Sequence, residues 1–126
     1  MKRLWLAVGI LCAVFAATLC SSFYLKGFTT DMTGLLTQAE AAAEAGDWAR
    51  AEQLTEHSLD IWEKHDMYLY TFLRHADTDQ VHTGFREVKE FLNCQEGGEY
   101  SAANARLIAQ IELLYEMEQF SLKNLL

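Results

Sequence analysis

Residues 4–25 read LWLAVGILCAVFAATLCSSFYL, a run of 22 residues that contains no charged side chain. At 1.5 Å per residue, a helix of this length crosses the roughly 30 Å hydrocarbon core of a bilayer. Lys2 and Arg3 precede the run, and only Lys26 follows it closely. Because basic residues tend to stay on the cytoplasmic side, the sequence predicts a single-pass cell-membrane protein with a cytoplasmic N-terminus and an extracytoplasmic C-terminal domain.

Two other interpretations of this segment stay open. A short basic start, an apolar run and small residues near 16–22 are also typical of a cleaved signal peptide. Lipoprotein processing at Cys20 is disfavoured, because the large Leu19 stands directly before the cysteine and Ala17 stands where a branched residue is usual. We expect an uncleaved signal-anchor over residues 1–25.

The rest of the chain is acidic and rich in helix-forming residues. The 126 residues leave room for the anchor and one compact domain, and there is no proline. Residues 27–126 hold 7 Lys and Arg against 18 Asp and Glu, a net charge of −11. This charge repels polyanions, so the sequence predicts no nucleic-acid binding. Cys94 is the one cysteine beyond the anchor, so the domain cannot form an internal disulfide.

The apolar periodicity predicts an all-α fold, with the anchor followed by a small antiparallel bundle of about four helices over residues 35–126. Residues 26–34 mix Gly, Thr and Asp and are predicted to form a juxtamembrane linker that leads into a helix near Asp31 or Thr33. The stretch 39–59 resembles the junction of helices A and B in a tetratricopeptide repeat. Since the pattern occurs once, the likeness predicts a helical hairpin and no superhelical array.

Residue types at the helix ends predict the turns. Gly46 is a left-handed C-cap and Asp47 an N-cap, so a tight turn should join the first two helices, the second continuing to about Arg74. Asp77 and Gln80 form a capping-box variant at the start of a third helix that ends near Cys94, with Gly97–Gly98 as the next turn and Ser101 as the next cap. The expected buried stripes are Val81, Phe85, Val88, Phe91 and Leu92, and then Ala105, Ile108, Ile111, Leu114, Tyr115 and Met117.

One cluster could hold a divalent metal such as zinc: His75, Asp77, Asp79 and His82 fall within eight residues. The cluster has neither the paired cysteines nor the HExxH spacing that fix a zinc site, and Val81, His82 and Val88 break a calcium loop that would begin at Asp77. We expect the carboxylates to stabilise a helix N-terminus, with no metal or cofactor bound.

The sequence contains no recognisable catalytic motif. There is no GxSxG elbow and no phosphate-binding glycine loop, and no basic residue adjoins Cys94 in the sequence to activate its thiol. We therefore expect no enzyme activity. Aromatic residues are more numerous on the second helix than one face can bury, and Trp62, Tyr68 and Tyr70 are candidates for a surface that binds a protein partner.

The whole chain resembles the domain of unknown function (DUF) 4363 family of small, membrane-anchored bacterial proteins. The likeness is carried by the apolar N-terminus, by Ala45-Gly46-Asp47-Trp48, Trp62-Glu63-Lys64-His65 and Phe72-Leu73-Arg74-His75 leading to Asp79, and by Glu118-Gln119-Phe120-Ser121-Leu122-Lys123-Asn124-Leu125-Leu126. The resemblance implies placement and shape but no catalytic residues. We expect a non-enzymatic accessory or interaction protein with a partner in the membrane or envelope, the alternative being an extracytoplasmic metal- or ligand-binding sensor.

Overall fold

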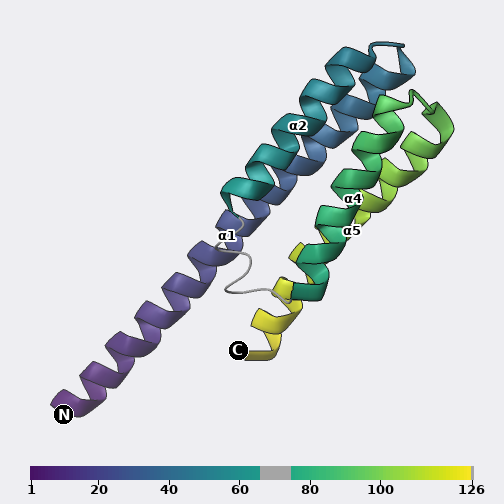
Figure 1. The fold of residues 1–126 in the computed structure, drawn as a ribbon. Coiled ribbons are helices and arrows are strands. Elements are labelled where there is room, and N and C mark those ends of the chain that lie inside the picture. The colour runs from purple at the N-terminus through teal and green to yellow at the C-terminus, as the bar shows by residue number, and fades with distance from the viewer. Residues whose placement is uncertain (66–74, 126) are drawn as a thin grey trace.

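The computed structural model describes the backbone of residues 1–65 and 75–125, and the side chains of these residues except 75–77, 118–119 and 121–125. Within this part the chain forms four helices (Figure 1), namely α1 (Lys2–Glu44), α2 (Trp48–Lys64), α4 (His75–Asn93) and α5 (Gly97–Leu125). Short turns make up the remainder of the described backbone, which confirms the predicted all-α class.

The helices form an antiparallel bundle in which each contacts two others. α1 packs against α2 and α5, and α4 packs against α5 and α2. Figure 1 shows both hairpin turns at the same end of the molecule, and the N-terminal half of α1 extending alone beyond the opposite end. The predicted bundle and its first helical hairpin are thus confirmed.

α1 runs without a break through residues 26–34, where the sequence predicted a linker. Gly and Thr lower helix propensity there by up to about 1 kcal/mol per residue. Phe28 and Met32, however, are buried in the bundle core, and burying such side chains contributes about 1.5–3 kcal/mol each. The tertiary contacts outweigh the local preference, so the helix start predicted near Asp31 or Thr33 is wrong.

α2 ends earlier than predicted. The sequence suggested a helix to about Arg74, whereas α2 stops at Lys64 and His65 forms its C-cap. The N–H of His65 donates to the carbonyl oxygen of Trp62 at 3.2 Å, a three-residue step that tightens the last turn. The rest of the predicted extension, residues 66–74, lies outside the described residues.

The α1–α2 turn follows the sequence prediction in detail. Gly46 has a φ of 84°, in the left-handed region that glycine adopts without strain. Its N–H donates to the carbonyl oxygen of Ala43 at 3.0 Å, and the N–H of Asp47 donates to that of Ala42 at 2.8 Å, which completes a Schellman motif. The carboxylate of Asp47 then accepts the N–H of Arg50 at 3.1 Å and caps α2.

The α4–α5 turn has the same hydrogen-bond pattern without a glycine at its left-handed position. Gln95 has a φ of 54°, and the N–H groups of Gln95 and Glu96 each donate to a carbonyl oxygen at the end of α4 at 3.1 Å. The chain therefore reverses at Gln95 and Glu96, directly before the turn predicted at Gly97–Gly98. Gly97 is already the first residue of α5. Ser101, predicted as a cap, lies one turn inside this helix.

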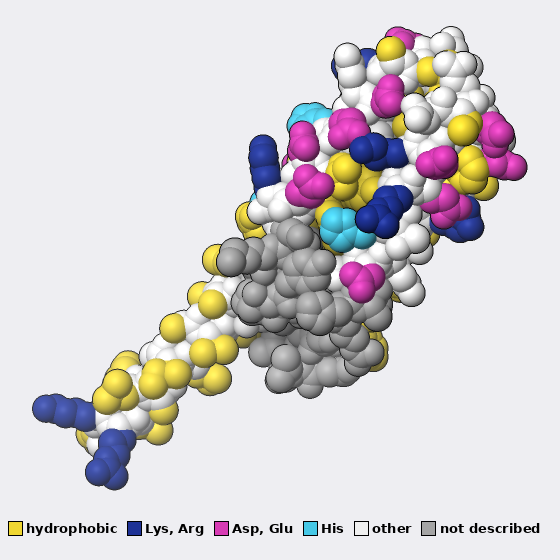
Figure 2. All heavy atoms as spheres, viewed as in Figure 1, with side chains coloured by type: hydrophobic (Ala, Val, Ile, Leu, Met, Phe, Trp, Pro, Cys, Tyr) yellow, Lys and Arg dark blue, Asp and Glu magenta, His cyan; other side chains and the backbone are white. Residues whose placement is uncertain are grey.

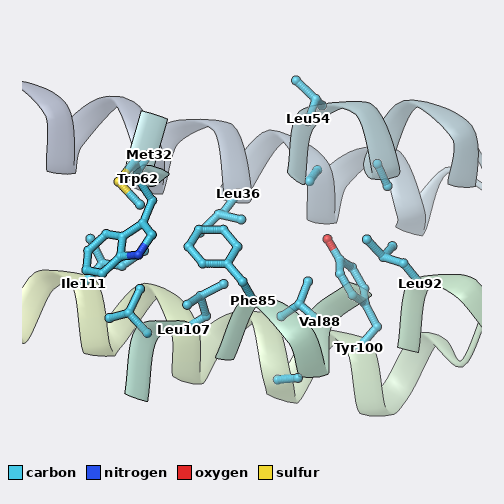
Figure 3. Packing of buried hydrophobic residues seen from close by; sticks show 14 of the residues in the cluster. Met32, Leu36, Leu54, Trp62, Phe85, Val88, Leu92, Tyr100, Leu107 and Ile111 are labelled. Atoms are coloured by element: carbon cyan, nitrogen blue, oxygen red, sulfur yellow. The ribbon is translucent and has the colours of Figure 1, made fainter. Parts of the chain in front are cut away.

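The core is one hydrophobic cluster to which all four helices contribute, and Figure 3 shows its side chains meeting between the two hairpins. The predicted stripe of α4 is confirmed, with Val81, Phe85, Val88 and Leu92 buried and Phe91 partly buried. On α5 the prediction is confirmed for Ile111 and Leu114, which are buried, and in part for Ile108 and Tyr115, which are partly buried; it is wrong for Ala105 and Met117, which are exposed. The buried residues of α5 are Tyr100, Ala103, Asn104, Leu107, Ile111 and Leu114.

The buried face of α5 includes a polar side chain. Asn104 is fully buried and its Nδ2 donates to the main-chain carbonyl oxygen of Leu36 in α1 at 3.0 Å. From the other side, the buried Ser58 of α2 donates its hydroxyl to the carbonyl oxygen of Met32 at 3.2 Å. The Asn104 bond directs this face of α5 toward α1, and Ala105, predicted to be buried, is exposed.

Comparison of the two turns yields a stability prediction. A non-glycine residue in the left-handed region costs about 1–2 kcal/mol, part of which the added flexibility of glycine in the unfolded chain offsets. We expect Gln95→Gly to raise the free energy of unfolding by about 0.5–1 kcal/mol and Gly46→Ala to lower it by about 1 kcal/mol. Nothing lies within 4 Å of a Cβ built on Gly46, so the latter variant tests backbone strain without a steric clash. Urea unfolding of the full chain in detergent measures the free energy of unfolding of both variants. A Gln95→Gly variant less stable than wild type would contradict a left-handed backbone conformation at Gln95.

Candidate membrane interface

The N-terminal half of α1 exposes almost all of its apolar side chains. Large hydrophobic residues from Leu4 to Phe23 project outward from this part of the helix, and Leu25 is the first residue of α1 in the core. Figure 2 shows this rod as a nearly continuous hydrophobic surface with basic side chains at its tip. α1 is long and apolar enough to cross a membrane, by length and composition.

The rings of Tyr24, Phe28 and His65 form a cluster where α1 leaves the bundle. The hydroxyl of Tyr24 lies 2.7 Å from Nδ1 of His65, the C-cap of α2, which is a hydrogen bond between residues far apart in the sequence. The ring of Phe28 lies 4.7 Å from the imidazole and 5.8 Å from the Tyr24 ring, measured between centroids. These contacts tie the end of α2 to α1 beside the apolar rod.

The charge state of His65 affects this cluster. Burial lowers the pKa of His65 below its usual value, and the neighbouring positive charge of Lys64 lowers it further. Nδ1 accepts a hydrogen bond from the Tyr24 hydroxyl when the imidazole is neutral with its proton on Nε2, and it donates to the hydroxyl oxygen when the ring is an imidazolium. The bond is compatible with both charge states, so burial and Lys64 are what favour the neutral histidine.

The four candidate metal ligands, from which we expected no metal site, are described only in part. Asp79 is exposed on α4, and His82 is half buried, with its ring edge-on to Trp62 at a centroid distance of 6.1 Å. The side chains of His75 and Asp77 lie outside the described residues, and α4 already includes His75, so Asp77 is not its N-cap. No group of three or more His, Cys, Asp or Glu among the described residues could hold a metal ion.

The predicted partner surface is wrong in one of its three residues. Trp62 is 0% exposed and lies in the core beside Met32 and Ile111, as Figure 3 shows. It faces inward because it continues the buried line of Thr55 and Ser58 on the side of α2 that meets the bundle. Tyr68 and Tyr70 lie outside the described residues and stay candidates.

Sequence reasoning missed two features of this end of the molecule. The Tyr24–His65 bond has no local signal, because it joins residues of different helices. The exposed side chains of Leu113, Met117 and Phe120 on α5 could have been found, since their spacing of four and three residues places them on one helical face.

The described part of the chain defines a class: a helical bundle whose first helix continues as an apolar rod long enough to span a membrane. The family described as Domain of unknown function (DUF4363) matches residues 19–125, and the chain belongs to this family. The match covers the whole bundle and the C-terminal end of the apolar segment, and it confirms the family resemblance seen in the sequence. No curated protein and no solved structure matches the chain.

The histidine cluster predicts a pH dependence of stability. At a pH just below the usual histidine value, the unfolded imidazole binds more protons than folded His65, so protonation favours unfolding. Stability should be complete above pH about 6.5 and should decline as pH falls through that value toward the lower folded pKa. Because other groups titrate in the same range, we compare wild type with His65→Asn by urea unfolding from pH 7.5 to 5.5. The variant should lose less stability than wild type, and equal losses would contradict a depressed pKa.

Proposed function

We propose that the chain is a single-pass membrane protein that holds a non-enzymatic helical bundle outside the membrane as an accessory or interaction module of the bacterial envelope. Residues 4–25 are the anchor in this proposal, and the N-terminus is cytoplasmic. The observation that carries it is the division of α1 at Leu25. N-terminal to this residue the large side chains are exposed and apolar, and from it onward one face of the helix is buried in the bundle.

Exposure of the apolar side chains of the rod to water would be energetically unfavourable. Leu4, Trp5 and Leu11 are each at least 69% exposed, and removing such a side chain from water contributes about 1.5–3 kcal/mol. Apolar patches of this extent are rare on monomeric proteins in water. A bilayer covers the whole circumference of the rod at once, which a single protein partner would not do.

The orientation rests on charge. Lys2 and Arg3 lie before the rod and Lys26 after it, and the acidic residues beyond contribute little to topology. Residues 27–126 carry a net charge of −11, so the bundle has little affinity for anionic headgroups. Most of its surface should therefore not contact the membrane.

The accessory role rests on what the sequence and site offer for chemistry. The sequence carries no nucleophile paired with a base, and the described acidic and histidine side chains do not converge on one point. Binding a protein partner requires exposed aromatic or apolar surface instead. Tyr68 and Tyr70 follow α2 in the sequence, and we assign them to that surface.

Labelling of Cys94 in intact cells tests the topology. The thiol is exposed at the turn between α4 and α5, at the end of the bundle farthest from the rod, so a bulky reagent can reach it. In a Cys12→Ala, Cys20→Ala background, we expect a membrane-impermeant maleimide to label Cys94 in intact cells. A variant that retains only Cys12 is the control, because a thiol within the membrane should not react. Labelling of Cys94 after lysis alone would place the bundle in the cytoplasm.

Co-purification tests the partner surface. We expect the double variant Tyr68→Ala, Tyr70→Ala to lose partners that cross-link to the wild-type chain, while circular dichroism and membrane association stay unchanged. His57→Ala is the matched control, since His57 is exposed on the neighbouring α2 and outside the proposed surface. If the double variant retained every cross-linked partner, Tyr68 and Tyr70 would not belong to the partner surface.

A further inference from the structure

α5 carries an apolar stripe that the bundle leaves uncovered. Leu113, Met117 and Phe120 are 52%, 37% and 68% exposed, and their spacing places them on one face of the helix. Beyond the first 24 residues, they are the exposed large hydrophobic side chains among the described residues. The other large hydrophobic side chains of the described bundle are buried or partly buried, which sets the stripe apart.

The position of the stripe along the membrane axis follows from the packing of α5 against α1. The two helices are antiparallel, and two contacts fix their register: Asn104 donates to the carbonyl oxygen of Leu36, and Ser101 donates to the carboxylate of Glu40. Both helices rise 1.5 Å per residue, so each step forward along α5 matches one step back along α1. Phe120 therefore lies at about the level of residue 20 of α1.

By the same register Met117 lies at about the level of residue 23 and Leu113 at about that of residue 27. Figure 1 shows the C-terminal end of α5 reaching farther toward the N-terminal half of α1 than the described end of α2 does. Met117 and Phe120 thus lie at the level of the outer end of the segment 4–25 that the proposed function places in the bilayer, and Leu113 lies just above it.

We propose that the Leu113, Met117 and Phe120 stripe is a second membrane contact, which inserts into the interfacial region of the outer leaflet beside the anchor. The inference rests on the proposed function, because the anchor sets the depth of the bilayer. The occupant is lipid since the exposed apolar surface of α1 continues at the same depth. Phe120 lies about five residues inside the outer boundary of the anchor, or roughly 8 Å, which matches the depth of interfacial helices.

The described acidic residues of α5 lie near the boundary of the anchor. Glu112 and Glu116 are exposed and lie at about the levels of residues 28 and 24, where flexible carboxylate side chains can reach headgroups and water. Phe120, the most exposed of the three apolar residues, is also the deepest. Two points of contact, α1 and the stripe, would fix the tilt of the bundle and hold Tyr24 and His65 at the interface.

Spin labelling of the full chain in vesicles of phosphatidylcholine and phosphatidylglycerol tests the contact. Single cysteines are placed at Leu113, Met117 and Phe120 in a background without native cysteines, and the collision rates of the attached nitroxide with oxygen and with an aqueous nickel chelate are measured. Ala102 is the matched control, because it is exposed and lies five helical turns above Phe120 on the same face. A variant that retains only Cys12 reports on the anchor.

We expect the ratio of oxygen to nickel collisions at Met117 and Phe120 to be several-fold higher than at Ala102, with Leu113 in between. If Cys12 shows the high ratio of a lipid environment while Phe120 matches Ala102, the anchor stands and the second contact is wrong. Shielding of Phe120 from both reagents would show a protein, such as a second copy, on the stripe and would also overturn the inference. If the ratio of oxygen to nickel collisions at Cys12 matched that at Ala102, residues 4–25 would not lie in the bilayer, and the proposed function would be wrong as well.

Discussion

The rest of the structure depends on the continuity of α1, one hydrogen-bonded helix of 43 residues and about 65 Å. Its two halves meet different surroundings: apolar residues surround the helix up to Tyr24, and from Leu25 onward one face alone is buried. A linker between the halves would let the bundle swing. A continuous helix transmits the orientation of one half to the other, since bending it sharply breaks backbone hydrogen bonds.

The second half of α1 has little apolar surface with which to specify its neighbours. Its buried face narrows toward the turn, from Leu36 to Ala39 and Ala43, and small side chains distinguish poorly between registers that differ by one turn. Ser58 and Asn104 donate to main-chain carbonyl oxygens of α1, and the hydroxyl of Ser101 donates to the carboxylate of Glu40. Main-chain carbonyl oxygens recur along α1, so the Glu40 side chain is the contact that distinguishes one register from the next. A buried polar side chain left without a partner costs about 1–3 kcal/mol.

Local features of the fold could be predicted from the sequence, and long-range features could not. The turn at Gly46 and Asp47 was predicted because its hydrogen bonds join residues within one stretch of chain. The segment 26–34 was misassigned because its weak helix propensity is overridden by burial against other helices. Trp62 was assigned to the surface because periodicity alone cannot decide which of several aromatic residues faces the core. The buried face of α5 was assigned in part to the wrong residues because it includes Asn104, and a polar side chain is not expected in a core from the sequence alone.

The same division applies to the candidate interface. The anchor could be read from residues 4–25 because it needs only length and apolar composition, whereas the depth of Phe120 depends on how α5 is aligned with α1. That alignment is set by Asn104 at Leu36 and Ser101 at Glu40, so two polar contacts fix where the apolar stripe lies relative to the anchor. A slip of one turn would move the stripe by about 5.4 Å along α1, a distance comparable to the whole depth of an interfacial helix. Core packing and membrane depth are therefore coupled through the register of these two helices.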